Sequence, residues 1–373
     1  MRFGPSEEQL ALRDTLRSLL GEHAHAARAA YEGDPADGRR LWDRMVRELG
    51  LTAVGVPEEY GGTGASFGDL AVVAEELGRA LAPVPFFSSA VLAARILLES
   101  GDDAGAWLPA LVRGESVATA ALVEEAGDWS FAELTTTARP AAGGWVLDGA
   151  KHFVTDAPVA DLLLVLARAP EGPTLFAVRA GDLSRHIPQD ALDATRPLGT
   201  VILRASPGVP VGPPGGALPV LERALAAAAI GLACEQAGGA NRCLDMAVGY
   251  AGIRKQFDRP IGSFQAVKHM LADVLVDNES ASAAASYGAW AVDHAPGEVP
   301  ALASLCKSFA SDAYTAAAKT NVQVHGGIGF TWEHDAHLHL RRALSTRAFL
   351  GSPQAHRELI AAHVLDAPRG ERR

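Results

Sequence analysis

The first region of the chain, residues 1–115, has hydrophobic residues at the spacing of amphipathic helices. In PSEEQLALRDTLRSLLGEHA we expect Ser6 to cap a helix with Glu7 and Glu8 in its first turn. One stripe of this helix is expected to carry Leu10, Leu12, Leu16, Leu19 and Leu20. RRLWDRMVRELG and SFGDLAVVAEELGRAL repeat the pattern, and the Gly-rich VPEEYGGTGAS between them is interpreted as a connection between helices. The pattern predicts a helical N-terminal domain.

The pattern then changes twice along the chain. Residues 116–207 contain short β-branched runs bounded by Gly, Pro and Asp, among them SVATAALV, GWVLDGAKHFVT, DLLLVLAR and TLFAVRA. Residues 208–219, GVPVGPPGGALP, are predicted to be a linker. Residues 220–373 return to helical periodicity, with long helices expected over 221–250, 264–294 and 301–324. We therefore predict an α+β fold with an N-terminal helical domain, a middle β-domain and a C-terminal helical bundle.

Composition and charge narrow the possible functions. The 373 residues carry a net charge of −11, which argues against a nucleic-acid surface but allows a local basic cleft for a phosphorylated ligand. The three cysteines, Cys234, Cys243 and Cys306, fit no zinc spacing, so we expect small buried side chains in a reducing compartment. The charged N-terminus and the short apolar run at 224–234 predict no signal peptide, no membrane span and a cytoplasmic location.

Residues 252–274, GIRKQFDRPIGSFQAVKHMLADV, place polar groups where core packing does not require them. Arg254, Gln256 and Phe257 combine a charge, an amide and a ring at the end of one helix, and Gln265 opens the next. The planar guanidinium of Arg254 is suited to pairing with a diphosphate. A solvated helix end is the alternative interpretation.

Two further segments have candidate binding chemistry. In NVQVHGGIGFTWEHDAHLHLRRA, residues 321–343, the HGGIG turn can bring backbone amides close to a phosphate or a ribose. In GWVLDGAKHFVTDA, Phe153 and Thr155 are expected to share one face of a strand. Four histidines lack a supporting carboxylate or cysteine pattern, so we expect solvated or capping roles and no metal for His325, His334, His337 and His339.

Taken together and in this order, these segments resemble the acyl-CoA dehydrogenase family. RKQF with PIGSFQAVKHMLAD, QVHGGIGF with W-E-H-D, and D-G-x-K-x-F-V-T are similar to its hallmark segments, and the resemblance covers essentially the whole chain. It implies two helical domains flanking a β-domain, with FAD between the β-domain and the C-terminal bundle and shared by two subunits.

The resemblance also implies roles for individual residues. A neighbouring subunit's FAD would be reached by Arg254, Gln256 and Phe257, with Gln265 nearby. The ADP half of FAD would meet Gln323, Gly326, Gly327 and Gly329. Phe153 and Thr155 correspond to the aromatic and hydroxyl pair beside the isoalloxazine ring, and Ser352 and Gln354 follow the catalytic position of the family.

The catalytic base of the family is missing from both of its usual places. The family removes an α-proton from an acyl-CoA thioester with a carboxylate, while the β-hydrogen leaves as hydride to the flavin. In RAFLGSPQ the base position holds Leu350, and the alternative position on the preceding helix holds Ala228. Neither side chain can accept a proton. Glu222 and Glu235 lie six and seven residues to either side of Ala228 and are weak candidates, for which surface or capping roles are favoured.

Two other segments depart from the family pattern. EEAGDWSFAEL, residues 124–134, stands where the family has a Thr-Glu-Pro-Gly loop, and Glu124 is the main residue kept. Asp258 replaces the usual glycine after the RKQF phenylalanine, which we expect to be tolerated at a helix end.

A chain that keeps the cofactor-binding segments but lacks the catalytic base resembles subunits of heteromeric actinobacterial acyl-CoA dehydrogenases. Such subunits are often associated with steroid catabolism. The leading hypothesis is an FAD-containing subunit whose homologous partner, in a heterotetramer, supplies the base. The alternatives are a self-sufficient homotetramer using Glu222 or Glu235, a non-catalytic FAD-binding subunit, and a member recruited to other chemistry. The family implies an acyl-CoA substrate, fatty or steroid-derived, and an electron-transferring flavoprotein as acceptor.

Overall fold

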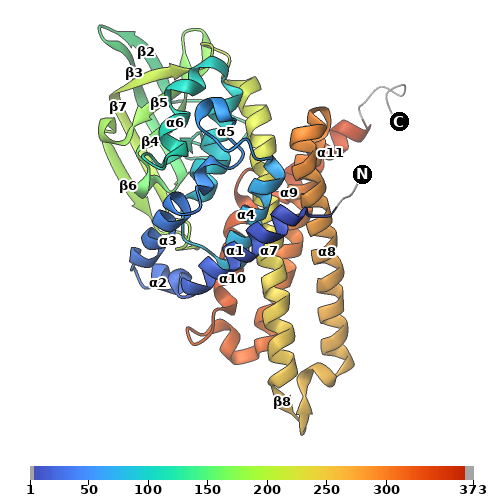
Figure 1. The fold of residues 1–373 in the computed structure, drawn as a ribbon. Helices are drawn as coiled ribbons and strands as arrows, with labels where there is room; N and C mark the ends of the chain where they lie inside the picture. Colours follow the sequence, from blue (N-terminus) through green and yellow to red (C-terminus); the bar gives the residue numbers. More distant parts are fainter. Residues whose placement is uncertain (1–3, 366–373) are drawn as a thin grey trace. The chain divides into compact units, whose positions relative to one another are not determined.

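The computed structural model describes residues 4–365 and divides into two compact units (Figure 1). The helical unit comprises the described parts of residues 1–38, 67–83 and 229–373. The sheet unit comprises residues 39–66 and 84–228. The N-terminal helical region is therefore shared between the two units. The α+β fold class is confirmed, with helices before and after a sheet.

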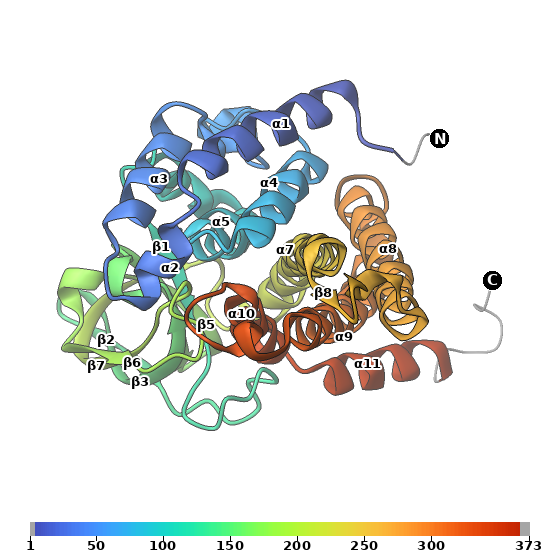
Figure 2. The ribbon, with the colours of Figure 1, turned by 90° about the horizontal axis from the view of Figure 1, so that it is seen from below.

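The helical unit is built around three long helices, with shorter helices packed against them. Its elements are α1 (Glu7–Glu22), α2 (Ala26–Tyr31), α4 (Phe67–Ala80), most of α7 (Ala217–Ile253), α8 (Gln265–His294), α9 (Val299–His325), α10 (Ala336–Ala348) and α11 (Pro353–Leu365). Figure 2 shows α7, α8 and α9 side by side, and α8, α10 and α11 all pack against α9. The helices predicted over 221–250, 264–294 and 301–324 are thus present.

The first helix begins as the sequence predicts. Ser6 Oγ accepts from the Gln9 N–H at 3.1 Å, and Gln9 Oε1 accepts from the Ser6 N–H at 3.1 Å, which closes a capping box. The expected stripe is only partly buried, because Leu16, Leu19 and Leu20 lie in the core whereas Leu10 is 43% exposed.

Helices α4 and α7 cross at two glycines with almost no space between their backbones. A Cβ atom on Gly78 would lie 2.0 Å from the carbonyl oxygen of Glu235. A Cβ atom on Gly238 would lie 1.9 Å from the carbonyl oxygen of Glu75. Since real Cβ contacts are far longer, only glycine fits at either position.

The sheet unit holds a seven-stranded sheet whose pairings close into a ring. Its strands are β1 (Ala118–Ala121), β2 (Thr137–Ala141), β3 (Gly144–Thr155), β4 (Leu162–Ala169), β5 (Gly172–Arg179), β6 (Arg185–Gln189) and β7 (Leu198–Val211). The ring runs β4–β2–β3–β7–β5 and returns to β4, with β1 parallel to β4 and β6 paired to β7. Beside it lie α3 (Ala36–Arg47), α5 (Ala94–Glu99), α6 (Leu108–Val112) and a π-helical segment at Phe87–Ala93.

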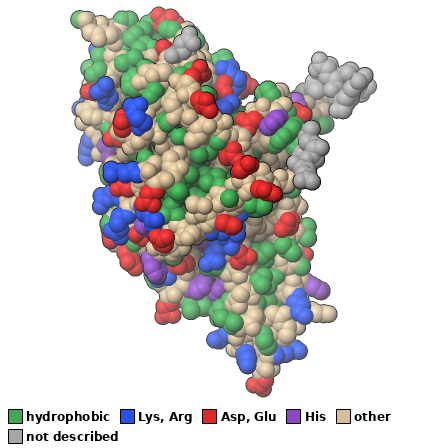
Figure 3. All heavy atoms as spheres, viewed as in Figure 1, with side chains coloured by type: hydrophobic (Ala, Val, Ile, Leu, Met, Phe, Trp, Pro, Cys, Tyr) green, Lys and Arg blue, Asp and Glu red, His purple; other side chains and the backbone are tan. Residues whose placement is uncertain are grey.

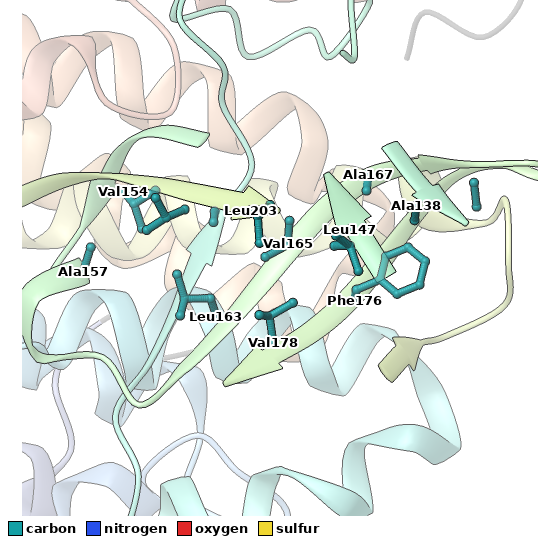
Figure 4. Close-up of a cluster of buried hydrophobic side chains, with 13 residues drawn as sticks. Ala138, Leu147, Val154, Ala157, Leu163, Val165, Ala167, Phe176, Val178 and Leu203 are labelled. Atoms are coloured by element: carbon teal, nitrogen blue, oxygen red, sulfur yellow. The ribbon is translucent and has the colours of Figure 1, made fainter. Parts of the chain in front are cut away.

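The interior of the ring is a compact apolar cluster. Leu147, Phe176 and Leu203 come from β3, β5 and β7 and meet there, as Figure 4 shows. Nearly every residue of β4 is buried, which explains its continuous LLLVLARA run in place of an alternating pattern.

The sequence predicts a linker at 208–219, buried cysteines and no membrane span. The linker expected at 208–219 is shorter, because β7 continues to Val211 by pairing with β5 and α7 begins at Ala217. The three cysteines are buried and free of disulfides, as predicted. Within residues 4–365, one helix, α7, is long and apolar enough to cross a membrane, but 67% of its most apolar window is buried in the protein, as for a core helix.

Candidate functional site

The end of β3 displays the first pair of predicted residues, although not by simple alternation. A register shift between Lys151 and Val154 interrupts the strand, and Phe153 adopts a left-handed φ of 54°. Phe153 is 43% exposed while Thr155 is buried, so the period-two argument for a shared face does not hold.

Thr155 has a hydroxyl with unused hydrogen-bonding capacity. Its backbone carbonyl accepts from Thr119 Oγ1 at 2.6 Å. Its own Oγ1 is buried and has no hydrogen-bond partner among the described residues. A buried hydroxyl without a partner costs about 1–3 kcal/mol. The oxygen and nitrogen atoms of a flavin ring would provide that partner, so this position fits the cofactor.

The loop after β1 is anchored by a buried ion pair that the sequence patterns did not reveal. Lys151 Nζ is fully buried and donates to Glu124 Oε1 at 3.0 Å and to the Leu122 carbonyl at 3.1 Å. Burial lowers the pKa of Lys151 to about 8, although the carboxylate raises it. Burial alone would raise the pKa of Glu124, but hydrogen bonds from Thr135, Thr136 and Lys151 outweigh it and lower that pKa to about 2. The retention of Glu124 in a divergent loop therefore has a structural reason.

In the helical unit, the α7–α8 connection gathers the second set of predicted residues at one exposed tip. Strands β8 (Lys255–Gln256) and β9 (Arg259–Pro260) form a hairpin whose turn residues, Phe257 and Asp258, have φ of 53° and 60°. Phe257 is 86% exposed and contacts Phe264, whose ring also stacks with the Arg259 guanidinium at 4.1 Å. Asp258 is thus part of a strained turn and not of a helix end, which corrects the expectation.

The same tip is locally basic in an acidic protein. Arg254, Lys255 and Arg259 are all exposed around the hairpin, and Gln256 and Gln265 are exposed beside them. Figure 3 shows basic side chains gathering there, at the lower end of the helical unit. Positive charge and amide groups of this kind suit a diphosphate. Strained φ values at exposed polar and aromatic positions also point to a binding function rather than to packing.

A ring stack joins this tip to the glycine-rich segment. Tyr250, one turn before Arg254, stacks on His325 with centroids 4.3 Å apart. His325 directly precedes the 3-10 segment Gly326–Phe330. Gln323, Gly326 and Gly327 are exposed, whereas Gly329 is buried with space for no Cβ, since one would lie 2.6 Å from the Val322 carbonyl. The two sets of residues expected at the diphosphate and adenosine thus lie on neighbouring segments.

The histidines near this segment are mainly buried, which corrects the expectation of solvated roles. His325 Nδ1 contacts the Asn321 carbonyl at 2.8 Å, and His339 Nδ1 contacts the Tyr314 hydroxyl at 3.0 Å. His337 is also buried, and its ring meets Trp332 edge-on. Among the described residues, no group of three or more His, Cys, Asp or Glu side chains could hold a metal ion.

The turn between α10 and α11 carries the third set of predicted site residues. Leu350 has φ of 58° and is 6% exposed. Ser352 and Gln354 are exposed but make local hydrogen bonds: Ser352 Oγ accepts from the Ala355 N–H, and Gln354 Nε2 donates to Glu358. Ser352 is therefore a helix cap as well as a candidate contact.

The carboxylates considered as substitute bases differ in environment. Ala228 is fully buried on α7, and Glu222 is exposed on the same helix. Glu235 Oε1 accepts from Arg342 Nη1 at 2.7 Å, with both side chains buried. This pairing favours a structural role for Glu235.

Comparison with known proteins identifies the family. Family models of acyl-CoA dehydrogenases match residues 6–115 (N-terminal domain), 119–197 (middle domain) and 216–365 (C-terminal domain). The chain is 34% identical over 371 residues to acyl-CoA dehydrogenase IpdE2 of Mycobacterium tuberculosis, covering 98% of this chain and 99% of that protein.

Solved structures agree with the sequence match. The ChsE4-ChsE5 complex from Mycobacterium tuberculosis has a TM-score of 0.86 at 28% identity, covering 99% of this chain and 100% of that one. The Tcur3481-Tcur3483 steroid ACAD has a TM-score of 0.85 at 30% identity, covering 96% and 98%. With these matches along its whole length, the chain belongs to the acyl-CoA dehydrogenase family, whose members are flavin-dependent oxidoreductases acting on acyl-CoA.

Proposed function

We propose that this chain is one subunit of a heteromeric acyl-CoA dehydrogenase, holds FAD across the subunit interface, and relies on a homologous partner for the catalytic base. The observation that carries the proposal is the contrast between two groups of positions. The cofactor positions keep their polar and aromatic residues, whereas the base positions hold Leu350 and Ala228, both buried and apolar. The ChsE4-ChsE5 complex, a structure of two different chains, supports a paired assembly.

In this proposal the chain contributes binding and orientation. The chemistry that bound FAD would supply is acceptance of the hydride that leaves the β-carbon of the acyl chain. Thr155 Oγ1, which is buried and has no hydrogen-bond partner among the described residues, would give the flavin ring a hydrogen bond, and Phe153 would pack beside that ring. The diphosphate and adenosine of a neighbouring subunit's FAD would be held by Arg254, Gln256, Phe257 and Gln265. The segment from Gln323 to Gly329 would hold the ADP half. Leu350 forms an apolar wall that excludes water.

We also propose a substrate class, an electron acceptor and a location. The acyl group is fatty or steroid-derived, and the steroid ACAD among the similar structures favours the latter. The electron acceptor is an electron-transferring flavoprotein, and the enzyme is cytoplasmic.

Flavin binding is tested first by substitution at the tip. Arg254→Ala removes a charge-assisted contact of about 1.5–3 kcal/mol and should weaken FAD binding about ten- to hundredfold. Arg242→Ala, an exposed arginine on α7, is the matched control and should keep full flavin content. Undiminished flavin in the Arg254 variant would contradict the assignment. Thr155→Val should keep the fold but shift the flavin absorption spectrum.

The missing base is tested by kinetics. The chain is purified alone and together with a co-expressed homologous subunit, and both are assayed against short-chain, long-chain and steroid CoA thioesters. We expect turnover only with the partner. Robust turnover by the chain alone would refute the heteromer. Glu222→Gln and Glu235→Gln would then show which carboxylate is the base of a self-sufficient enzyme. Flavin binding without turnover in either sample would instead indicate a non-catalytic subunit.

A further inference from the structure

The turn that contains Leu350 is stabilised by hydrogen bonds to its main-chain carbonyls rather than by contacts of the Leu350 side chain. It lies between α10 and α11, and Leu350 and Gly351 follow each other with φ of 58° and 101°. A leucine rarely adopts the left-handed conformation, so neighbouring groups must stabilise it. Three carbonyls of this segment, from Arg347, Leu350 and Gly351, accept hydrogen bonds from two buried side chains. We call these side chains, Lys307 and His356, the turn clamp.

Lys307 bridges the two ends of the turn. Its Nζ is fully buried and donates to the Arg347 carbonyl at 3.2 Å, to the Gly351 carbonyl at 3.2 Å and to Ser311 Oγ at 2.9 Å. Ser311 gives its own proton to Gln236 Oε1 at 3.1 Å, which leaves its lone pairs for the lysine. An ammonium group has three N–H donors, and here each has an acceptor.

His356 holds the middle of the turn. Its Nε2 lies 2.9 Å from the Leu350 carbonyl, and because a carbonyl only accepts, this nitrogen carries the proton. Its Nδ1 lies 3.3 Å from Ser304 Oγ, whose hydroxyl can donate to it. A Cβ on Gly351 would come within 3.1 Å of Nε2, so the glycine also leaves room for the ring.

We propose that Lys307 and His356 are positioning residues that fix the Leu350 turn through its main chain and so place the adjoining Ser352–Gln354 segment for the cofactor. The last part rests on the proposed function, whereas the clamp itself concerns the backbone of one chain. Because the turn clamp donates hydrogen bonds to main-chain carbonyls, the turn can keep its conformation without a carboxylate side chain at residue 350. This explains how a subunit can lose the base and retain the segment around it.

Hydrogen exchange measured by mass spectrometry tests the clamp in the full chain with its partner. The variants are Lys307→Met, His356→Phe and His356→Gln, with Lys319→Met, an exposed lysine on the same helix, as control. Loss of a hydrogen bond should speed exchange in residues 347–356 at least about tenfold in the Lys307→Met and His356→Phe variants. Exchange in β4 should stay unchanged. The His356→Gln variant retains an N–H donor and should exchange close to the wild-type rate, as should the control.

Each outcome decides the proposal. Wild-type exchange in both clamp variants, or equal acceleration in β4, would overturn it. If Lys307→Met does not fold, the comparison of His356→Phe with His356→Gln decides. Flavin content is the second readout, and we expect it to fall with His356→Phe and to recover with His356→Gln. Faster exchange with unchanged flavin content would show that the turn clamp does not place the Ser352–Gln354 segment for the cofactor. If the wild-type complex holds no flavin, the proposed function is wrong. The hydrogen-exchange rates of residues 347–356 still test whether Lys307 and His356 fix the turn.

Discussion

The ion pair between Glu235 and Arg342 allows a sharp test of whether Glu235 is structural or catalytic. The two side chains are 6% and 3% exposed, and their atoms are 2.7 Å apart. Removing one member of such a buried pair takes away the counter-charge of the other, which costs about 3–5 kcal/mol. Arg342→Met should therefore lower the free energy of unfolding by about that amount. Glu235→Gln keeps a neutral acceptor, so its cost should be nearer the 1.5–3 kcal/mol of one charge-assisted hydrogen bond, as an order-of-magnitude figure.

The double variant Glu235→Leu with Arg342→Met removes both charges and should recover much of the loss, because apolar replacement of a buried pair is often neutral. The assay is urea unfolding followed by circular dichroism, at equal protein and flavin concentrations, with turnover of the assembled enzyme measured in parallel. We expect lower midpoints for the single variants and retained turnover for those that fold. A Glu235→Gln protein with an unchanged midpoint and no turnover would refute this reasoning and make Glu235 a base.

Three further predictions concern packing, strain and pH. Gly238→Ala should disrupt the folded state, because the added Cβ would lie 1.9 Å from the Glu75 carbonyl, whereas Gly249→Ala on the same helix meets nothing within 4 Å and should stabilise it by up to ~1 kcal/mol. Equal melting temperatures for the two variants would contradict the close crossing. Asp258→Gly should raise the melting temperature, since glycine relieves the left-handed φ of 60°; a lower value would show that the aspartate side chain stabilises the turn. Burial lowers the pKa of Lys307 from 10.5 to about 7, so the unfolded chain binds more protons between these values. Stability from this group should therefore rise with pH across that window, and Lys307→Met should lack that part of the slope in unfolding titrations.

A structural feature could be predicted from the sequence when it depends on residues that are close together along the chain. The Ser6 cap needs only residues three positions apart, and the long bundle helices follow from periodicity. Strands β2, β6 and β7 were not among the predicted runs. For β2 and β6 the reason is that TARPA and RHIPQ contain proline and are mostly exposed or half-buried. The linker was predicted too long because its glycines and prolines continue β7, whose pairing with β5 is not visible locally.

The candidate site shows the same limit. The tip and the glycine-rich segment were found through family resemblance, since one arginine and a few glycines are weak signals alone. Lys151 with Glu124, and Lys307 with the Leu350 turn, join residues separated by 27 to 44 positions along the chain. No spacing rule connects such pairs. The bulge at Phe153 also depends on pairing with β7 and cannot be inferred from alternation.

The crossing of α4 and α7 has a mechanical consequence for assembly. With each glycine seated against the opposing backbone, α7 cannot slide along α4 by a residue without driving a side chain into a carbonyl. Beyond Gly238 the helix is therefore a rigid arm of roughly 22 Å, at 1.5 Å per residue, that ends at Ile253. Any adjustment to a differently shaped neighbour must come from the hairpin at the end of the arm, where Phe257 and Asp258 form its strained turn.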